Sequence, residues 1–290
     1  MPKRRRSSRV LTRLNRYLGD EPEKFVELLA EKMVSGLGRT EPPFQTGAFE
    51  YAALAGARVI QTDSRNYSGA MSVFDGDIVI HVRRDDSLER KNFTVCHEIG
   101  HIELRKAAGL LKPSRTNDGS FLDLEKSHEG TTTREELLVH EFAANLLMPK
   151  KVFSEKAKSL VPGLESVQAL SKIFLTSLGA TVRRIISLKI WPCIVVWGVP
   201  EKMVGEDAWA VKVQEFKSTF RTGLSWAEHK YIWWAGKQFW RASQSEFIVE
   251  DTVAIEGKCW RFEGLREWHY VSRYQRENRV MAMFLPPKTA

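Results

Sequence analysis

The stretch Cys96-His97-Glu98-Ile99-Gly100-His101 contains the pattern His-Glu-x-x-His, on which most of the functional interpretation of this sequence depends. Residues four apart on an α-helix lie on one face, so the imidazoles of His97 and His101 can bind the same metal ion. Two histidine nitrogens and a carboxylate suit zinc in a tetrahedral site that leaves one position for water. The ion lowers the pKa of that water, and Glu98 is placed to take its proton as general base. The pattern therefore predicts a Zn²⁺-dependent enzyme that attacks a carbonyl group, such as that of a peptide bond.

The residues around this pattern predict a long and partly buried helix rather than an ordinary surface helix. Ser87 is a suitable N-cap, and the helix is expected to run to about Lys106. Placing two histidines and the carboxylates of Glu98 and Glu103 in a partly buried helix costs stability unless these groups are paired or bind an ion. This cost favours a metal site over a chance occurrence of the pattern. The apolar side of the helix is formed by Phe93, Val95, Ile99 and Ile102.

A third ligand is expected on the next helix, at about residues 134–148. Glu136 and His140 lie one turn apart on one face of this helix. The segment from Thr133 to Glu136 also fits a capping box, in which the glutamate only reaches back to the start of the helix. Spacing alone does not choose among the candidates, which are Glu135, Glu136, His140 and Glu141.

Two segments together resemble the signatures of the ImmA/IrrE family of metallopeptidases, the DUF955 group. Residues 90–101, Arg-Lys-Asn-Phe-Thr-Val-Cys-His-Glu-Ile-Gly-His, are similar to the family's Arg-x-x-Phe-Thr segment leading into HExGH. Residues 136–149 are similar to its second signature, a glutamate six residues before Phe-Ala-Ala, followed by Leu-Leu-Met-Pro. The resemblance covers about residues 46 to 188. It implies an α+β fold with a zincin-like core of helices and a small sheet. It also implies a gluzincin-like zinc metallopeptidase, in which the third zinc ligand is a glutamate.

The resemblance also implies roles for individual residues. His97, His101 and Glu136 match the zinc ligands, and Glu98 matches the catalytic glutamate. This sequence departs from the family at His140, where the family usually has asparagine. We expect His140 to take part in catalysis from just outside the ligand set, because it lies one turn after Glu136. A histidine there could orient the site, stabilise the oxyanion or bind zinc as a fourth ligand, and the last case would make the metal structural.

The family is linked to the cleavage of repressor proteins that are often encoded beside it in mobile elements or stress-response loci. The resemblance therefore implies site-specific cleavage of a transcriptional repressor or an antitoxin-like regulator. The alternative is a non-cleaving, DNA-associated regulator, or a toxin–antitoxin or defence component, that retains the zinc fold.

The chain is expected to divide into three regions: 1–45, 46–190 and 191–290. The first is a basic arm followed by an amphipathic helix from Pro22 to Val34. The second is the metallopeptidase domain, with strands at about 58–62, 69–74 and 78–82 and a helical pair at 165–188. This pair resembles a helix-turn-helix, but its second helix begins with few basic or amide residues, which favours packing on the core over DNA binding.

The third region holds all nine tryptophans and is expected to be a small α+β domain of unknown role. Its tryptophans fit a hydrophobic core better than a stacking platform for bases. We expect a helix at 226–240 and strands at about 193–199, 247–255, 269–274 and 279–285.

The net charge of +8 is mostly a property of the first 16 residues, which carry seven basic side chains and no acidic one. The arm is either a solvated tail or a contact for nucleic acid or another acidic partner. No stretch is long and apolar enough for a transmembrane helix, so no membrane association is expected. The three cysteines form no CxxC pattern, which suits a reducing compartment. We expect a cytoplasmic protein whose partner is a protein substrate, and the sequence does not predict its oligomeric state.

Overall fold

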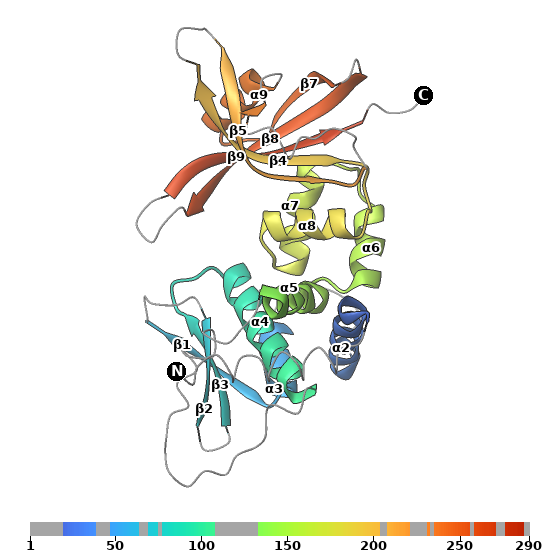
Figure 1. Cartoon of the computed structure of the whole chain (residues 1–290), viewed down its shortest axis with the longest axis vertical. Coiled ribbons are helices and arrows are strands. Elements are labelled where there is room, and N and C mark those ends of the chain that lie inside the picture. The colour runs from blue at the N-terminus through green and yellow to red at the C-terminus, as the bar shows by residue number, and fades with distance from the viewer. Residues whose placement is uncertain are drawn as a thin grey trace. The chain divides into compact units, whose positions relative to one another are not determined.

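The structure is a computed structural model with an α+β architecture, as the sequence predicts (Figure 1). The chain divides into two compact units. Unit 1 comprises Met1–Phe153 and Ser171–Ala180, and unit 2 comprises Ser154–Leu170 and Thr181–Ala290. The domain boundaries expected near residues 45 and 190 stay a prediction. The structure describes residues 20–38, 47–63, 69–74, 77–107, 133–203, 208–220, 231–232, 235–255, 258–270 and 276–286. The basic arm lies outside these residues.

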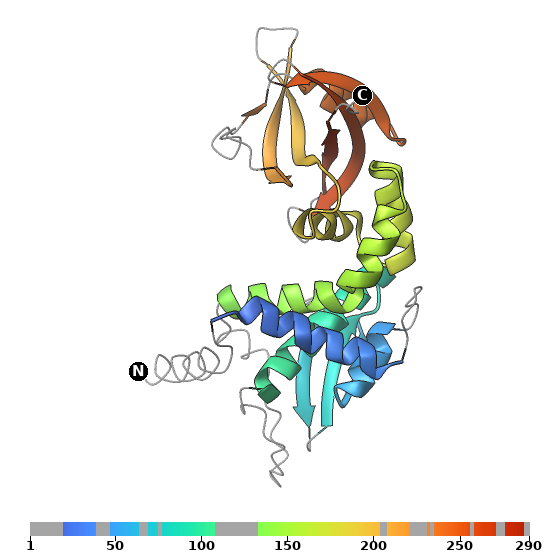
Figure 2. The same ribbon diagram turned by 90° about the vertical axis from the view of Figure 1, so that its right-hand side faces the viewer.

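Unit 1 combines a three-stranded sheet with helices that pack on it and on one another (Figures 1 and 2). The strand order is β1-β3-β2, in which β1 pairs with β3 in parallel and β2 pairs with β3 antiparallel. Helix α4 packs on α5, and α2 packs on α5 as well. The bounds are α2 (Pro22–Gly36), α3 (Gly47–Leu54), β1 (Ala57–Thr62), β2 (Gly69–Phe74), β3 (Asp77–Arg83), α4 (Leu88–Ala107) and α5 (Thr133–Leu147).

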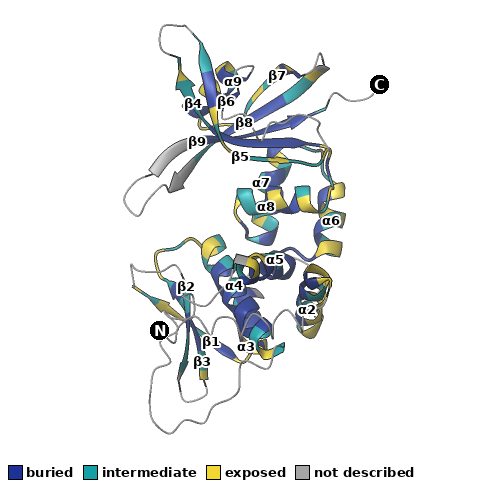
Figure 3. Cartoon of the chain, viewed as in Figure 1, coloured by how far each residue is buried: buried dark blue, intermediate teal, exposed yellow. Residues whose placement is uncertain are grey.

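Helix α4 begins at the N-cap that the sequence predicts, because the backbone amide of Arg90 donates a hydrogen bond to Ser87 Oγ at 3.3 Å. Its apolar residues Val95, Ile99 and Ile102 are fully buried, and the buried faces of α4 and α5 meet in Figure 3. Gly100 lies at this contact. A Cβ atom there would come within 3.0 Å of a Val139 methyl carbon and 3.1 Å of the Phe142 ring, so the glycine allows the two helices to approach closely.

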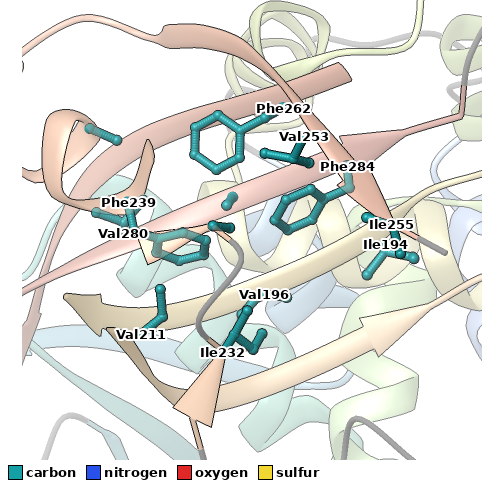
Figure 4. Packing of buried hydrophobic residues seen from close by; sticks show 13 residues of the cluster. Ile194, Val196, Val211, Ile232, Phe239, Val253, Ile255, Phe262, Val280 and Phe284 are labelled. Atoms are coloured by element: carbon teal, nitrogen blue, oxygen red, sulfur yellow. The ribbon is translucent and has the colours of Figure 1, made fainter. Parts of the chain in front are cut away.

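Unit 2 contains an antiparallel sheet of six strands in the order β6-β5-β4-β9-β8-β7. Helix α9 (Gly236–Gln244) packs on one face, where aromatic and aliphatic side chains form the core shown in Figure 4. Phe262 is central in this core, with ring centroids 5.7 Å from Phe239 and 5.4 Å from Phe284. The strands are β4 (Ile194–Lys202), β5 (Trp209–Ser218), β6 (Tyr231–Ile232), β7 (Val249–Ile255), β8 (Lys258–Tyr270) and β9 (Arg276–Leu285).

The helical pair consists of α7 (Leu164–Phe174) and α8 (Leu178–Ser187). The two arginines of α8, Arg183 and Arg184, lie within unit 2, where one contacts other side chains and the other is buried. Arg183 Nε donates a hydrogen bond to Glu215 Oε1 at 3.0 Å, and its guanidinium lies 5.2 Å from the centroid of the Trp197 ring. Arg184 is 3% exposed. These contacts support the interpretation of the pair as packing elements rather than as a DNA reader.

The structure corrects several expectations in the later part of the chain. Helix α6 (Lys150–Lys158) follows α5 directly and was not expected, and neither was strand β5. The helix expected at 226–240 is wrong over Tyr231–Ile232, which form strand β6, and the helix begins at Gly236. The pairing of β6 with Val211 and Lys212 explains this error. A two-residue strand that is defined by a distant partner has no periodic pattern of its own in the sequence. Strand β8 begins before the expected strand at 269–274, whose last four residues are not described.

Tryptophans divide between core and surface. Trp197 is fully buried and Trp191 is 3% exposed, as a core role predicts. Trp240 is 36% exposed and stacks on Trp209 at 5.3 Å between ring centroids. Within the described residues, no helix has both the length and the apolar character needed to cross a membrane.

The aromatic core of unit 2 gives the first testable prediction. Phe284→Ala removes a fully buried ring from the centre of the sheet, and we expect the free energy of unfolding to fall by about 3–5 kcal/mol. Phe247→Ala is the matched control, because this ring is 80% exposed and its loss should change stability by less than about 0.5 kcal/mol. Denaturant unfolding of both variants measures the difference. Equal destabilisation would contradict the assigned core.

Candidate metal centre

Helices α4 and α5 supply the candidate metal ligands, and they run in opposite directions past one another. Arg105, near the end of α4, lies 3.6 Å from the Glu135 carboxylate at the start of α5. Phe93, a few turns earlier on α4, lies 5.6 Å from His140 further along α5, measured between ring centroids. Gly100 keeps the two helices close between these contacts. Side chains from both helices can therefore reach one point.

His97, His101 and Glu136 meet at this point. The Nε2 atoms of His97 and His101 are 3.2 Å apart. The carboxylate of Glu136 lies 3.4 Å from His97 Nε2 and 3.5 Å from His101 Nε2. Bonds of about 2.0–2.2 Å in a tetrahedral zinc site place the ligand atoms roughly 3.3–3.5 Å from one another. The three side chains thus have the chemistry and the spacing for a single zinc ion, with the fourth position open.

Glu135 contacts the opposite side of His101. Its Oε1 accepts a hydrogen bond from His101 Nδ1 at 3.1 Å, and its side chain is 4% exposed. This bond places the proton on Nδ1 and leaves the lone pair of Nε2 for a metal ion. Glu135 and Glu136 are adjacent but point about 100° apart around the helix, so they serve different nitrogens of the same ring. Spacing identified Glu135 as a candidate ligand, whereas its contact assigns it a positioning role.

The charge around His101 favours a cation at this site. Burial by itself lowers the pKa of His101, but hydrogen bonds to Glu135 and Glu136 and the charge of Glu98 raise the pKa to about 9. Excess negative charge of this kind stabilises a proton or a metal ion on the ring. Zinc binding at the site therefore competes with protonation of the histidine.

Glu98 lies beside the edge strand of the small sheet. Its side chain is buried, with 4% exposed. A Cβ atom added to Gly69, the first residue of β2, would come within 3.4 Å of Glu98 Oε1 and 2.1 Å of Thr94 Cγ2. The absence of a side chain at Gly69 thus lets β2 lie directly against the face of α4 that carries the glutamate. Strand β2 pairs with β3 on one side, at the end of the sheet.

His140 lies at the exposed side of the ligand set. Its ring centroid is 5.0 Å from that of His97, and one ligand atom from each of His97, Glu136 and His140 falls within 4.8 Å of the others. Although the residue as a whole is exposed, desolvation lowers the pKa of its ring. The charge of Glu136 raises that pKa, and the charges of His101 and Arg90 lower it.

Glu141, the remaining candidate ligand, and Cys96, which precedes His97, make contacts of other kinds. The Glu141 carboxylate accepts a hydrogen bond from the Asn145 side chain at 3.1 Å on α5. Cys96 is fully buried, and burial raises the pKa of its thiol, so it packs rather than reacts at ordinary pH.

Comparison with known proteins places this site in a family. Residues 52–185 match the model of Peptidase_M78, described as the IrrE N-terminal-like domain. Over these residues the chain is similar to the ImmA/IrrE family. No curated protein matches the chain. Among solved structures, a Mycobacterium tuberculosis transcriptional regulator superposes with a TM-score of 0.61 and 14% identity, over 91% of this chain and 76% of that one. At this identity the likeness shows a shared fold.

The ImmA/IrrE match confirms the resemblance that the two sequence signatures indicate. It includes α4 and α5, which bring every candidate ligand of the metal centre into the matched region. It ends within α8, so the sheet of unit 2 lies beyond it. The family is one of metallopeptidase-like domains, and the cluster of His97, Glu136 and His140 could hold a metal ion.

Glu135 and Glu136 make different contacts, so we expect their removal to lower the affinity for zinc by different amounts. We expect Glu135→Ala to weaken zinc binding by about 10–100-fold, because His101 loses the carboxylate that orients it. Glu136→Ala removes a ligand, and we expect a larger loss. Glu141→Ala on the same helix is the control and should bind zinc as the unchanged chain does. Competition with a chromophoric chelator measures all three affinities. Equal affinities for the Glu135 and Glu136 variants would contradict this division.

Proposed function

We propose that this chain is a zinc-dependent peptidase in which His97, His101 and Glu136 hold the ion and Glu98 is the general base. The observation that carries the proposal is the meeting of two imidazole nitrogens, 3.2 Å apart, with the Glu136 carboxylate, whose Oε2 lies 3.4 Å from His97 Nε2 and whose Oε1 lies 3.5 Å from His101 Nε2. The buried carboxylate of Glu98 lies on the same helix as the two histidines. The peptidase family to which the domain belongs supports the same reaction.

The protein side chains divide the work of hydrolysis between them. Zinc, when bound, supplies a Lewis acid that polarises the substrate carbonyl and lowers the pKa of a water molecule. Glu98 accepts the proton of the attacking water and passes it to the departing amine. Glu135 keeps His101 in the tautomer and orientation that the site needs, with Arg105 Nε 3.6 Å from the same carboxylate.

The edge strand β2 supports a peptide as the substrate. An edge strand carries main-chain N–H and C=O groups that can pair with an extended peptide. Because β2 lies against Thr94 and Glu98 at Gly69, a peptide added to this edge would pass next to the general base. The sheet would then hold the substrate while α4 and α5 supply the chemistry.

The proposed substrate is a segment of a regulatory protein, either a transcriptional repressor or an antitoxin-like regulator, in the cytoplasm. Its support is the family and the sequence signatures. The fold shared with a protein described as a transcriptional regulator is consistent with a regulatory setting. The basic N-terminal arm is proposed to contact nucleic acid through its charge.

Zinc content and cleavage are the test of this function. The full chain, purified without chelators, should contain about one zinc per molecule, and Glu98→Gln should retain it because glutamine replaces only the base. A library of peptides prepared from a digested proteome should gain new termini, detected by mass spectrometry, with the unchanged chain and not with Glu98→Gln.

Two results would overturn the function in different ways. A chain without zinc would remove the proposed metal site. A zinc-loaded chain that cuts neither peptides nor repressors, yet binds DNA in a salt-sensitive way that deletion of residues 1–16 abolishes, would establish the alternative of a non-cleaving regulator.

The position of β2 can be tested separately. Gly69→Ala places a methyl group 2.1 Å from Thr94 Cγ2, which forces the strand away from α4. We expect peptide cleavage to fall by about 10–100-fold, because the substrate is displaced from the base, while the zinc content stays the same. Adding Thr94→Ala to this variant removes the clashing atom and should restore much of the activity. Unchanged cleavage by Gly69→Ala would show that β2 does not position the substrate.

A further inference from the structure

His140 occupies the open side of the metal triangle. It lies one turn after Glu136 on α5, and it is exposed whereas His101 is buried. Phe93 of α4 packs against its ring at 5.6 Å between centroids, and His97 lies at 5.0 Å on the same side. The ring is therefore held next to His97 on the solvent-exposed side of α5.

The distances separate His140 from the three ligands. The Nε2 atoms of His97 and His101 are 3.2 Å apart, and each lies 3.4–3.5 Å from one of the two Glu136 carboxylate oxygens. The nitrogen of His140 comes within 4.8 Å of His97 and Glu136, but His140 forms no hydrogen bond or ion pair with any residue that the structure describes. A fourth tetrahedral ligand would need to be roughly 3.3–3.5 Å from the other three. Because His140 forms no ion pair with the Glu136 carboxylate, its ring lies beyond this spacing on the Glu136 side of the ligand set.

A side chain at this distance from the ligands can donate a hydrogen bond to a substrate atom that occupies the fourth position of the metal site. An atom at the open position of the site would be roughly 3.3–3.5 Å from each ligand atom. A donor about 2.7–3.1 Å from that atom, on the side of His97 and Glu136, can lie within the 4.8 Å that bounds the distance from His140 to these two residues. The ring N–H would then point to the substrate rather than to the metal.

We propose that His140 donates a hydrogen bond to the carbonyl oxygen of the peptide bond that is cut. This inference rests on the proposed peptidase function. As water oxygen bonds to the carbonyl carbon, the π electrons of the C=O move to the oxygen, and His140 N–H stabilises the negative charge there. Glu98 takes one proton of the water and gives it to the amide nitrogen as the C–N bond breaks, which leaves a carboxylic acid and an amine. The second proton of the water then leaves the new carboxylic acid for solvent, which gives the carboxylate. His140 keeps its own proton throughout.

The test compares His140→Ala with His140→Asn, because asparagine also offers an N–H donor at this position. Leu137→Ala is the control on the same helix, since Leu137 is 64% exposed. Three quantities are measured on the full chain: zinc affinity by chelator competition, affinity of the zinc-loaded chain for acetohydroxamate by calorimetry, and kcat and KM on a peptide that the unchanged chain cuts.

For His140→Ala we expect zinc affinity to be unchanged. Acetohydroxamate affinity should fall about tenfold, because its carbonyl oxygen loses a donor. The kcat should fall by about 10²–10³ with little change in KM. His140→Asn should recover part of both losses, and Leu137→Ala should show neither.

Each other outcome overturns the inference. Weaker zinc binding together with tighter acetohydroxamate binding in His140→Ala would make His140 a fourth ligand. No change in acetohydroxamate affinity or kcat would make it a bystander. Absence of zinc from the unchanged chain would instead refute the proposed function itself, so the two failures are distinguishable.

Discussion

The close approach of α4 and α5 at Gly100 is the constraint on which the metal centre depends. A Cβ atom at this position would press on Val139 and Phe142, which are both fully buried. With the glycine in place, His97 and His101 from one helix come within 3.5 Å of Glu136 from the other. A shift of one ångström between the helices would break the spacing that zinc requires. The geometry of the metal site therefore depends directly on the packing of the apolar faces of α4 and α5.

The charges of the site oppose this packing unless a cation is present. Glu98 and Glu135 are buried, and Glu136 lies next to them on the same two helices. Buried carboxylates cost free energy unless they are paired, and the raised pKa of His101 shows how strongly they attract positive charge. A divalent ion satisfies this demand better than a single proton does. Metal binding and the stability of unit 1 are therefore coupled.

The metal motif was predictable because it depends on local helix geometry. Other parts of the chain were not predictable because they depend on contacts between residues far apart in the sequence. Helical periodicity alone places His97 and His101 on one face, and the N-cap at Ser87 follows from the sequence. The choice between Glu135 and Glu136 needs the rotation of α5 against α4, which spacing does not contain. In unit 2, β6 is defined by pairing with a strand some twenty residues earlier. Gly236, the first residue of α9, likewise lies too close to the backbone of Trp209 for a side chain to fit, which is a contact that local periodicity does not contain.

The arrangement of the site separates the groups that hold the metal from the groups that select the substrate. Zinc ligands and their orienting carboxylate lie on rigid, buried helices, where small displacements are costly. The general base faces the edge of a sheet at Gly69, and His140 lies on the exposed side of α5. In the proposed peptidase, changes at the sheet edge or at position 140 would therefore alter which peptide is cut and how fast, without disturbing the ion.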